Sequence, residues 1–125
     1  EQVVVDEQVA KLQIKVASTE DAVSSLSGGN QQKVVVGNWL STRPRVMLFD
    51  EPTRGIDVQA KQQLFQVMWD LSCEGIATIF VSTELEELVE VCHRILIMRE
   101  GRIVDEVRPE TLTADELALR CMGEN

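Results

Sequence analysis

The residue types best suited to chemistry stand in two short segments of the chain. The first is Ser27-Gly28-Gly29, which comes just before a run of residues with helical spacing. Glycines let the backbone approach a ligand closely, and the start of a helix offers unpaired amides and the positive end of its dipole. Ser27 adds a hydroxyl donor, so the group suits the terminal phosphate of a nucleotide. Taken alone, the same residues fit a plain glycine turn before a helix, which is the commoner case.

The second segment is the acidic pair Asp50-Glu51, which directly follows the apolar run of residues 46–49. A continuous apolar run predicts a strand that is buried on both faces of a parallel sheet. The carboxyl ends of such strands are where α/β sheets bind ligands. Asp50 is then placed to hold Mg²⁺, usually through water, and Glu51 to polarise an attacking water. A strand that merely ends in solvated acids is the alternative.

The elements predicted around these segments alternate between helices and strands. Residues 1–25 alternate only loosely between apolar and polar, and we predict an irregular lead-in there. Apolar residues at helical spacing predict helices over residues 30–42, 57–75, 85–92 and 113–123. Strands are predicted at residues 46–49 and 76–81, and a hairpin around Glu100-Gly101. The order predicts an α/β fold with layered helices on a mostly parallel sheet and a C-terminal hairpin.

Residues that end or begin these helices are visible in the sequence. Asp57 is predicted to cap the second helix and Gly75 to stop it. Thr113 and Glu116 have the spacing of a capping box, and Gly123 closes the last helix. In the third helix the apolar stripe leaves three acids on the solvated side, and these are Glu86, Glu87 and Glu90.

Composition narrows the class of protein. The 125 residues carry a net charge of −9 with scattered basic residues, whereas nucleic-acid binders normally have a basic face. The widely spaced Cys73, Cys92 and Cys121 form no CxxC pair, which indicates buried thiols in a reducing cytosol. Trp39 and Trp69 fall on predicted helices and indicate core or interface packing. No apolar run approaches the roughly 18 residues that a membrane helix needs.

Together the motifs resemble those of the ATP-binding cassette (ABC) ATPase family. LSGGNQ at residues 26–31 resembles the ABC signature, residues 46–51 resemble Walker B, and residues 52–57 resemble the D-loop. The longer runs LSGGNQQK at 26–33 and DEPTRGIDV at 50–58 resemble the second cassette of fused sugar importers of the ribose/galactose type. On this resemblance we expect a cut N-terminus and a native C-terminus.

The resemblance implies a fold and a division of the chain. The fold is a partial P-loop NTPase (ABC ATPase) fold. Residues 1–42 would be the end of the helical subdomain and the signature helix. Residues 43–125 would run from Walker B to the C-terminus.

The resemblance also implies a role for each motif residue. Glu51 would be the catalytic residue and Asp50 the Mg²⁺ ligand. Signature residues would bind the ATP held by another cassette, and these are Ser27, Gly28, Gly29, Asn30 and Gln31. The D-loop would contain Gly55, Ile56 and Asp57. ATP and Mg²⁺ are the implied cofactors.

Two features depart from the family pattern. No GxxxxGK[ST] occurs in the 125 residues, so we expect the chain alone to be inactive as an ATPase. The switch position, where the family usually has histidine, is Thr83. Threonine cannot offer the proton or charge that histidine offers a γ-phosphate. Second cassettes of the sugar-importer type often have serine or threonine there, and the change suggests that this cassette's own site is impaired.

The implied partners are the first ABC cassette of the same polypeptide, transmembrane permease subunits and, indirectly, a sugar-binding protein, with no nucleic acid. The implied location is the cytoplasmic face of the cell membrane, as a peripheral subunit. Because the strands lack their expected neighbours, we also expect the chain alone to self-associate. Two alternatives stay open: a non-transport ABC ATPase that acts on nucleic acid or ribosomes, and a regulatory cassette that binds nucleotide without turnover.

Overall fold

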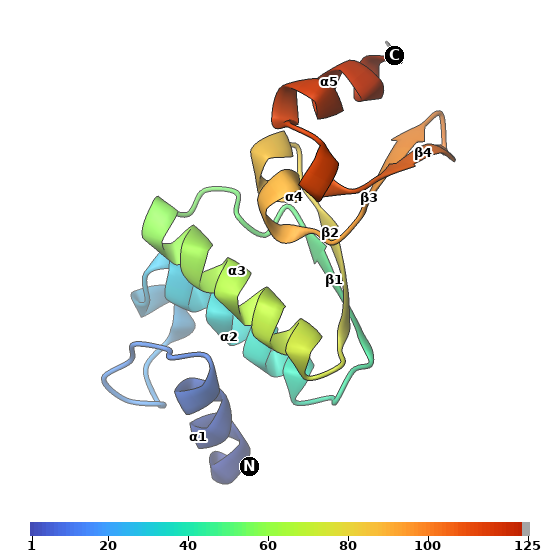
Figure 1. Cartoon of the computed structure of the whole chain (residues 1–125). Coiled ribbons are helices and arrows are strands. Elements are labelled where there is room, and N and C mark those ends of the chain that lie inside the picture. The colour runs from blue at the N-terminus through green and yellow to red at the C-terminus, as the bar shows by residue number, and fades with distance from the viewer. Residues whose placement is uncertain (124–125) are drawn as a thin grey trace. The chain divides into compact units, whose positions relative to one another are not determined.

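The chain divides into two compact units, Glu1–Ile79 and Phe80–Asn125. The computed structural model describes residues 1–123 (Figure 1). The first unit contains α1 (Gln2–Lys11), a short 3-10 helix η1 (Val23–Ser25), α2 (Gly28–Leu40), β1 (Val46–Asp50), α3 (Val58–Cys73) and the start of β2 (Ala77–Val81). The second contains the end of β2, α4 (Leu85–Val91), β3 (Ile95–Arg99), β4 (Arg102–Val107), η2 (Pro109–Thr111) and α5 (Ala114–Met122).

The core of the first unit is built on α3. Figure 1 shows α2 and α3 lying side by side, and the two helices pack against each other. Leu64 and Phe65 on α3 are 2% and 0% exposed. Full burial of such side chains stabilises a fold by about 1.5–3 kcal/mol each. The other buried apolar side chains of this unit are Leu12, Val36, Leu40, Met47, Phe49, Val67, Met68 and Leu71.

The predicted ends of α3 are confirmed. The Asp57 side chain accepts a hydrogen bond from the Ala60 amide at 2.9 Å, which satisfies one of the free donors of the first turn. After the helix, Gly75 adopts φ +85°, the left-handed conformation that favours glycine. Residues 58–73 therefore form a helix with a defined start and a defined stop.

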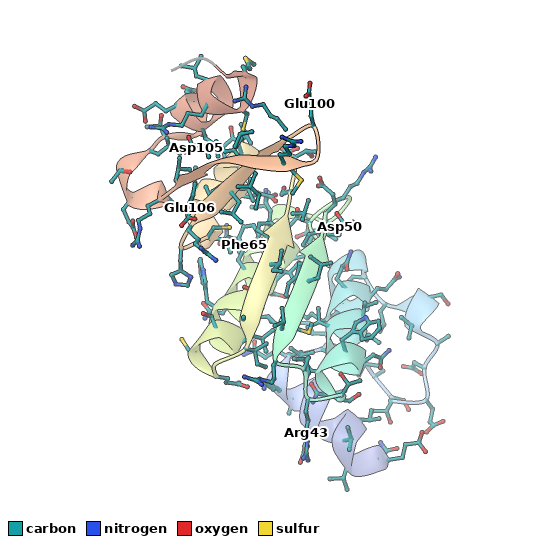
Figure 2. The ribbon with its side chains drawn as sticks, turned by 90° about the vertical axis from the view of Figure 1, so that its right-hand side faces the viewer. Arg43, Asp50, Phe65, Glu100, Asp105 and Glu106 are labelled. Carbon is teal, nitrogen blue, oxygen red and sulfur yellow. The ribbon has the colours of Figure 1, made fainter. Side chains whose placement is uncertain are left out.

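Strands β1 and β2 are neighbours in a sheet and point in the same direction (Figure 2). The expectation that β1 is buried on both faces is wrong for the described residues. Met47 and Phe49 are 6% and 5% exposed, whereas Val46 and Leu48 are 55% and 66% exposed. Because successive side chains of a strand point to opposite faces, one face of β1 packs on the core and the other is open.

The irregular lead-in predicted for residues 1–25 is wrong for residues 2–11 and 23–25, whereas residues 12–22 form no helix or strand. Residues 2–11 form α1, and residues 23–25 form a 3-10 turn. No residue of α1 is buried, and three of its valines (Val3, Val4 and Val5) are consecutive and exposed, so the helix lacks the apolar periodicity that sequence patterns reveal. Leu12, just after α1, is 2% exposed and lies against Gly37 of α2.

The C-terminal hairpin is confirmed. Strands β3 and β4 pair antiparallel and are joined by Glu100 and Gly101 at φ +49° and +75°. Positive φ at both central residues is the type I′ geometry that matches the twist of a hairpin. The core of the second unit consists of Ile95, Ile97, Val107 and Leu117. The capping box of α5 and its left-handed Gly123 are present as predicted.

The expectation of three buried thiols fails. Cys73 and Cys121 are exposed, because each lies in the last turn of its helix, and only Cys92 is half-buried; all are free thiols. Trp39 is 62% exposed, so it lies outside the core, and the alternative of interface packing stays a prediction. Among the described residues, no helix combines the length and apolar character needed to cross a bilayer.

Candidate functional site

The signature segment forms the start of α2. Ser27 is the N-cap and is exposed, and its Oγ accepts hydrogen bonds from the Asn30 amide at 3.4 Å and from Asn30 Nδ2 at 3.1 Å. The helix predicted from residue 30 begins two residues earlier, because Gly28 and Gly29 are the first two residues of α2. The first amides of a helix have no partner within it, so this end offers donors to an anion.

Close packing, rather than an unusual backbone angle, explains one of these glycines. A Cβ on Gly29 would lie 2.5 Å from the Cβ of Ala60 in the first turn of α3. A Cβ on Gly28 would meet only Ile56 Cγ2, at an ordinary 3.8 Å. Gly29 therefore lets the signature helix sit directly against α3, and the structure brings the signature and D-loop segments together.

The D-loop joins β1 to α3. Gly55 adopts φ +78°, Ile56 is half-buried beside Gly28, and Asp57 caps α3 as described above. Pro52 and Thr53 are buried, which fixes the loop to the core of its unit. The loop therefore places Ile56 beside the signature.

The amide side chains of the signature bind within the protein. Gln31 Nε2 donates to the Leu26 carbonyl at 2.8 Å, and Asn30 Oδ1 accepts from the Lys15 amide at 3.1 Å. These bonds hold the turn that presents Ser27. Asn30 and Gln31 were expected to face the nucleotide, and the contact with residue 15 has no signal in the sequence.

Lys33 is a further buried group near the signature that sequence reasoning did not single out. It is 4% exposed, and its Nζ donates to the Gln13 carbonyl at 3.3 Å. Burial, with a smaller contribution from the positive charge of Lys15, lowers the pKa of Lys33. Lys33 and Asn30 together attach residues 13–15 to the signature helix.

The acidic pair lies at the carboxyl end of β1. Asp50 is the last residue of the strand and is exposed (Figure 2), and Glu51 is half-buried. Glu51 adopts φ +46°, and a non-glycine residue in this region costs roughly 1–2 kcal/mol. Backbone strain of this kind clusters at functional sites, so it makes Glu51 a candidate for function.

The residues present fit a magnesium site completed by a nucleotide. Within residues 1–123 there is no group of three or more acidic, histidine or cysteine side chains that could hold a metal ion. Mg²⁺ keeps several waters and binds through one or two carboxylates and phosphate oxygens. The exposed carboxylate of Asp50 suits that single-ligand role.

The residue predicted at the switch position lies in the second unit. Thr83 is exposed and follows β2, next to Ser82. The Ser82 hydroxyl donates to Glu87 Oε2 at 3.0 Å and accepts from the Glu84 amide at 3.0 Å. Glu87 is 4% exposed, so its predicted solvation is wrong. It turns inward because the first turn of α4 brings it back to Ser82, a pairing that the apolar stripe of α4 does not reveal.

The sequence matches known proteins along most of its length. Residues 1–54 match the family model described as ABC transporter. The ribose import ATP-binding protein RbsA 2 of Streptomyces avermitilis is 45% identical over 114 residues, which is 91% of this chain and 23% of that protein. The arabinose import ATP-binding protein AraG of Shigella flexneri is 46% identical over 111 residues, 89% of this chain and 22% of that protein.

Solved structures agree on the fold. A nucleotide-free ATP-binding cassette from an ABC transporter superposes with a TM-score of 0.80 at 23% identity, over 94% of this chain and 47% of that one. CbiO1 from Clostridium perfringens gives 0.77 at 23% identity, over 95% of this chain and 47% of that one. The fold is therefore that of an ABC ATPase cassette in part. The chain spans less than a quarter of the length of these two curated relatives, and it is similar to such import ATP-binding proteins over about nine tenths of its own length.

Proposed function

We propose that this chain is part of an ATP-binding and ATP-hydrolysing subunit that energises the import of a sugar through an ABC transporter. The support is the set of relatives named as ribose and arabinose import ATP-binding proteins, at 45% and 46% identity over about nine tenths of the chain. The sugar itself would be bound by other subunits.

In this proposal the signature completes an ATP site whose P-loop belongs to a partner cassette. The observation that carries it is the exposed Ser27 hydroxyl at the start of a 13-residue helix, whose first amides have no partner among the helix carbonyls. Gly28 and Gly29 keep side chains away from this end, and the helix dipole favours the negative charge of a terminal phosphate. Asn30 and Gln31 hold the loop in shape.

The acidic pair would serve the site on this cassette's own side. Glu51 would orient and polarise the attacking water, since its strained backbone holds the carboxylate directly after the strand. Asp50 would hold Mg²⁺, which when bound neutralises charge on the phosphates. Gly55, Ile56 and Asp57 would join this site to the signature through the contact of Ile56 with Gly28.

The proposed partners follow from the same role. They are a first cassette on the same polypeptide, permease subunits in the membrane and, through these, a sugar-binding protein. The proposed location is peripheral, on the cytoplasmic face of the cell membrane. The net charge of −9 gives no support to a nucleic-acid partner.

One observation favours a second candidate, a regulatory cassette that binds nucleotide without turnover. Thr83 stands at the switch position, and a threonine hydroxyl does not change charge near neutral pH as a histidine does. The retained Glu51 favours turnover.

The test is Ser27→Arg in the intact protein reconstituted with its permease. A bulky cation at the N-cap should abolish transport and ATPase activity while ATP binding to the P-loops is kept, because Ser27 would serve the closed site only. Val58→Arg is a matched control, since Val58 is 71% exposed. Normal turnover in Ser27→Arg would refute the proposed pairing.

A further inference from the structure

We propose that Asn30 is a positioning residue that orients the Ser27 hydroxyl so that its proton points outward, toward the terminal phosphate. The inference rests on the proposed function, since it assigns a role within the ATP site that the signature would complete. It concerns Asn30 itself, which would act through Ser27 and not by touching the nucleotide.

The orientation of the Asn30 amide is fixed by a group that can only donate. The Lys15 backbone N–H points at Asn30 Oδ1 at 3.1 Å, and a backbone N–H has no acceptor capacity. The oxygen of the amide must therefore face Lys15. It follows that the NH₂ group faces Ser27, independently of how the two ends of an asparagine are usually told apart.

The Ser27 oxygen is consequently used as an acceptor twice. It accepts from Asn30 Nδ2 at 3.1 Å and, more weakly, from the Asn30 amide at 3.4 Å. A hydroxyl has two acceptor lone pairs and one donor proton. With both acceptor positions occupied by Asn30, the proton is the only hydrogen-bonding capacity that Ser27 has left.

That proton has no acceptor within the part of the chain that the structure describes. Ser27 is exposed at the helix start, where the unpaired amides already favour an anion. A phosphate oxygen carries no proton to donate at neutral pH, so a hydroxyl held as a donor matches it. Preorganised donors avoid the cost of reorienting when the ligand arrives.

Two substitutions separate this role from a purely structural one. Asn30→Ala removes both bonds and leaves the hydroxyl free to rotate. Asn30→Asp keeps the shape and the acceptor for Lys15, but it offers Ser27 an acceptor where Asn30 offers a donor. The Ser27 proton would then turn inward, and Asn30→Asp should lower turnover more than Asn30→Ala does. A structural role predicts the reverse order, because the aspartate preserves the Lys15 anchor.

The deciding experiment is a double-mutant cycle in the intact protein, with ATP turnover, ATP KM and thermal melting measured for each variant. We expect Ser27→Ala to lower kcat about tenfold, because it removes one hydrogen bond to a charged group. Asn30→Ala should lower kcat about fivefold, because it weakens that hydrogen bond without removing it. When Ser27→Ala is already present, adding Asn30→Ala should have no further effect on kcat. Asn38→Ala on the same helix is the matched control.

The outcomes are distinguishable. If Ser27→Ala leaves kcat unchanged, the proposed function of the signature fails. If Ser27→Ala lowers kcat and Asn30→Ala lowers it by the same factor with and without Ser27→Ala, the proposed function stands and the inference is overturned, because Asn30 then acts independently of Ser27. Loss of the Asn30→Ala effect in the Ser27→Ala variant supports the inference, and an Asn30→Asp effect larger than the Asn30→Ala effect adds support.

Discussion

Gly29 and Ala60 face each other across the contact between α2 and α3 with no space for a second methyl group. A Cβ on Gly29 would lie 2.5 Å from the Cβ of Ala60. The glycine of the signature is therefore needed by the packing of the unit itself, before any nucleotide is considered. The proposed role in ATP binding and the role in packing meet at one residue.

This contact predicts opposite effects for neighbouring glycines. Gly29→Ala should destabilise the chain by about 1–3 kcal/mol, the usual cost of overpacking. Gly28→Ala should be neutral or stabilising by up to about 1 kcal/mol, since alanine is the better helix former and the site has room. Urea denaturation measures both. The double variant Gly29→Ala, Ala60→Gly should recover most of the stability that Gly29→Ala loses. If it does not, the contact with Ala60 is not the cause of the destabilisation.

A second prediction concerns the ATPase activity of the chain alone. Its 125 residues contain no GxxxxGK[ST], so no loop in them can cradle the β-phosphate. Purified chain should release no phosphate above background in a steady-state assay. Glu51→Gln is the control that identifies a contaminating enzyme. Turnover that disappears with Glu51→Gln would contradict the prediction.

A third prediction concerns acid titration in the second unit. The hydrogen bond from Arg120 to Asp105, at 2.9 Å, and a second from the Glu106 amide lower the pKa of Asp105. A carboxyl with a lowered pKa in the folded state contributes stability above its unfolded pKa, near 3.8, and loses it as pH falls through the folded value.

Arg120→Gln should therefore raise the pKa of Asp105. The variant should be less stable than the wild-type chain at neutral pH, and this difference in stability should shrink below about pH 3.8. A carbon-detected NMR titration of the Asp105 carboxyl gives the pKa, and denaturation at pH 3 and pH 7 gives the stability. Arg108→Gln removes an exposed arginine elsewhere in the unit and should change neither. An unchanged Asp105 titration in Arg120→Gln would show that the ion pair is not formed in solution.

The fourth prediction is self-association of the chain alone through the open face of β1. Val46 and Leu48 are 55% and 66% exposed and share that face. Exposed apolar patches on sheets favour association. Light scattering over a range of concentrations should show a dimer or larger species, and Leu48→Lys should shift it toward monomer. Val58→Lys on α3 is the control. A strictly monomeric wild-type chain would rule the prediction out.

Local signals predicted much of the fold because each has a short-range cause. Asp57, Gly75, Thr113 and Gly123 mark helix ends through capping chemistry that depends only on neighbouring residues. The turn at Glu100-Gly101 follows from the same kind of local preference. Helix α1 was missed because it buries none of its own residues and so has no apolar period.

The site was predicted less completely, since its details depend on contacts between segments. The motif residues are predicted from the sequence, but the structural reason for Gly29 lies in Ala60, 31 positions later in the sequence. The inward turn of Glu87 and the Asn30–Lys15 bond likewise need the folded chain. A stripe of apolar residues tells which side of a helix is buried, but not which polar group finds a partner there.

The bond between the Lys15 amide and Asn30 makes the signature sensitive to a segment outside it. If the closed Lys15–Asn30 bond raises the affinity of the signature for a phosphate, a bound phosphate must, by thermodynamic reciprocity, favour that bond by the same factor. Nucleotide held at the signature would therefore slow hydrogen exchange of the Lys15 amide, although no atom of residue 15 needs to touch it. The backbone at residue 15 is in this sense a reporter of occupancy at the signature.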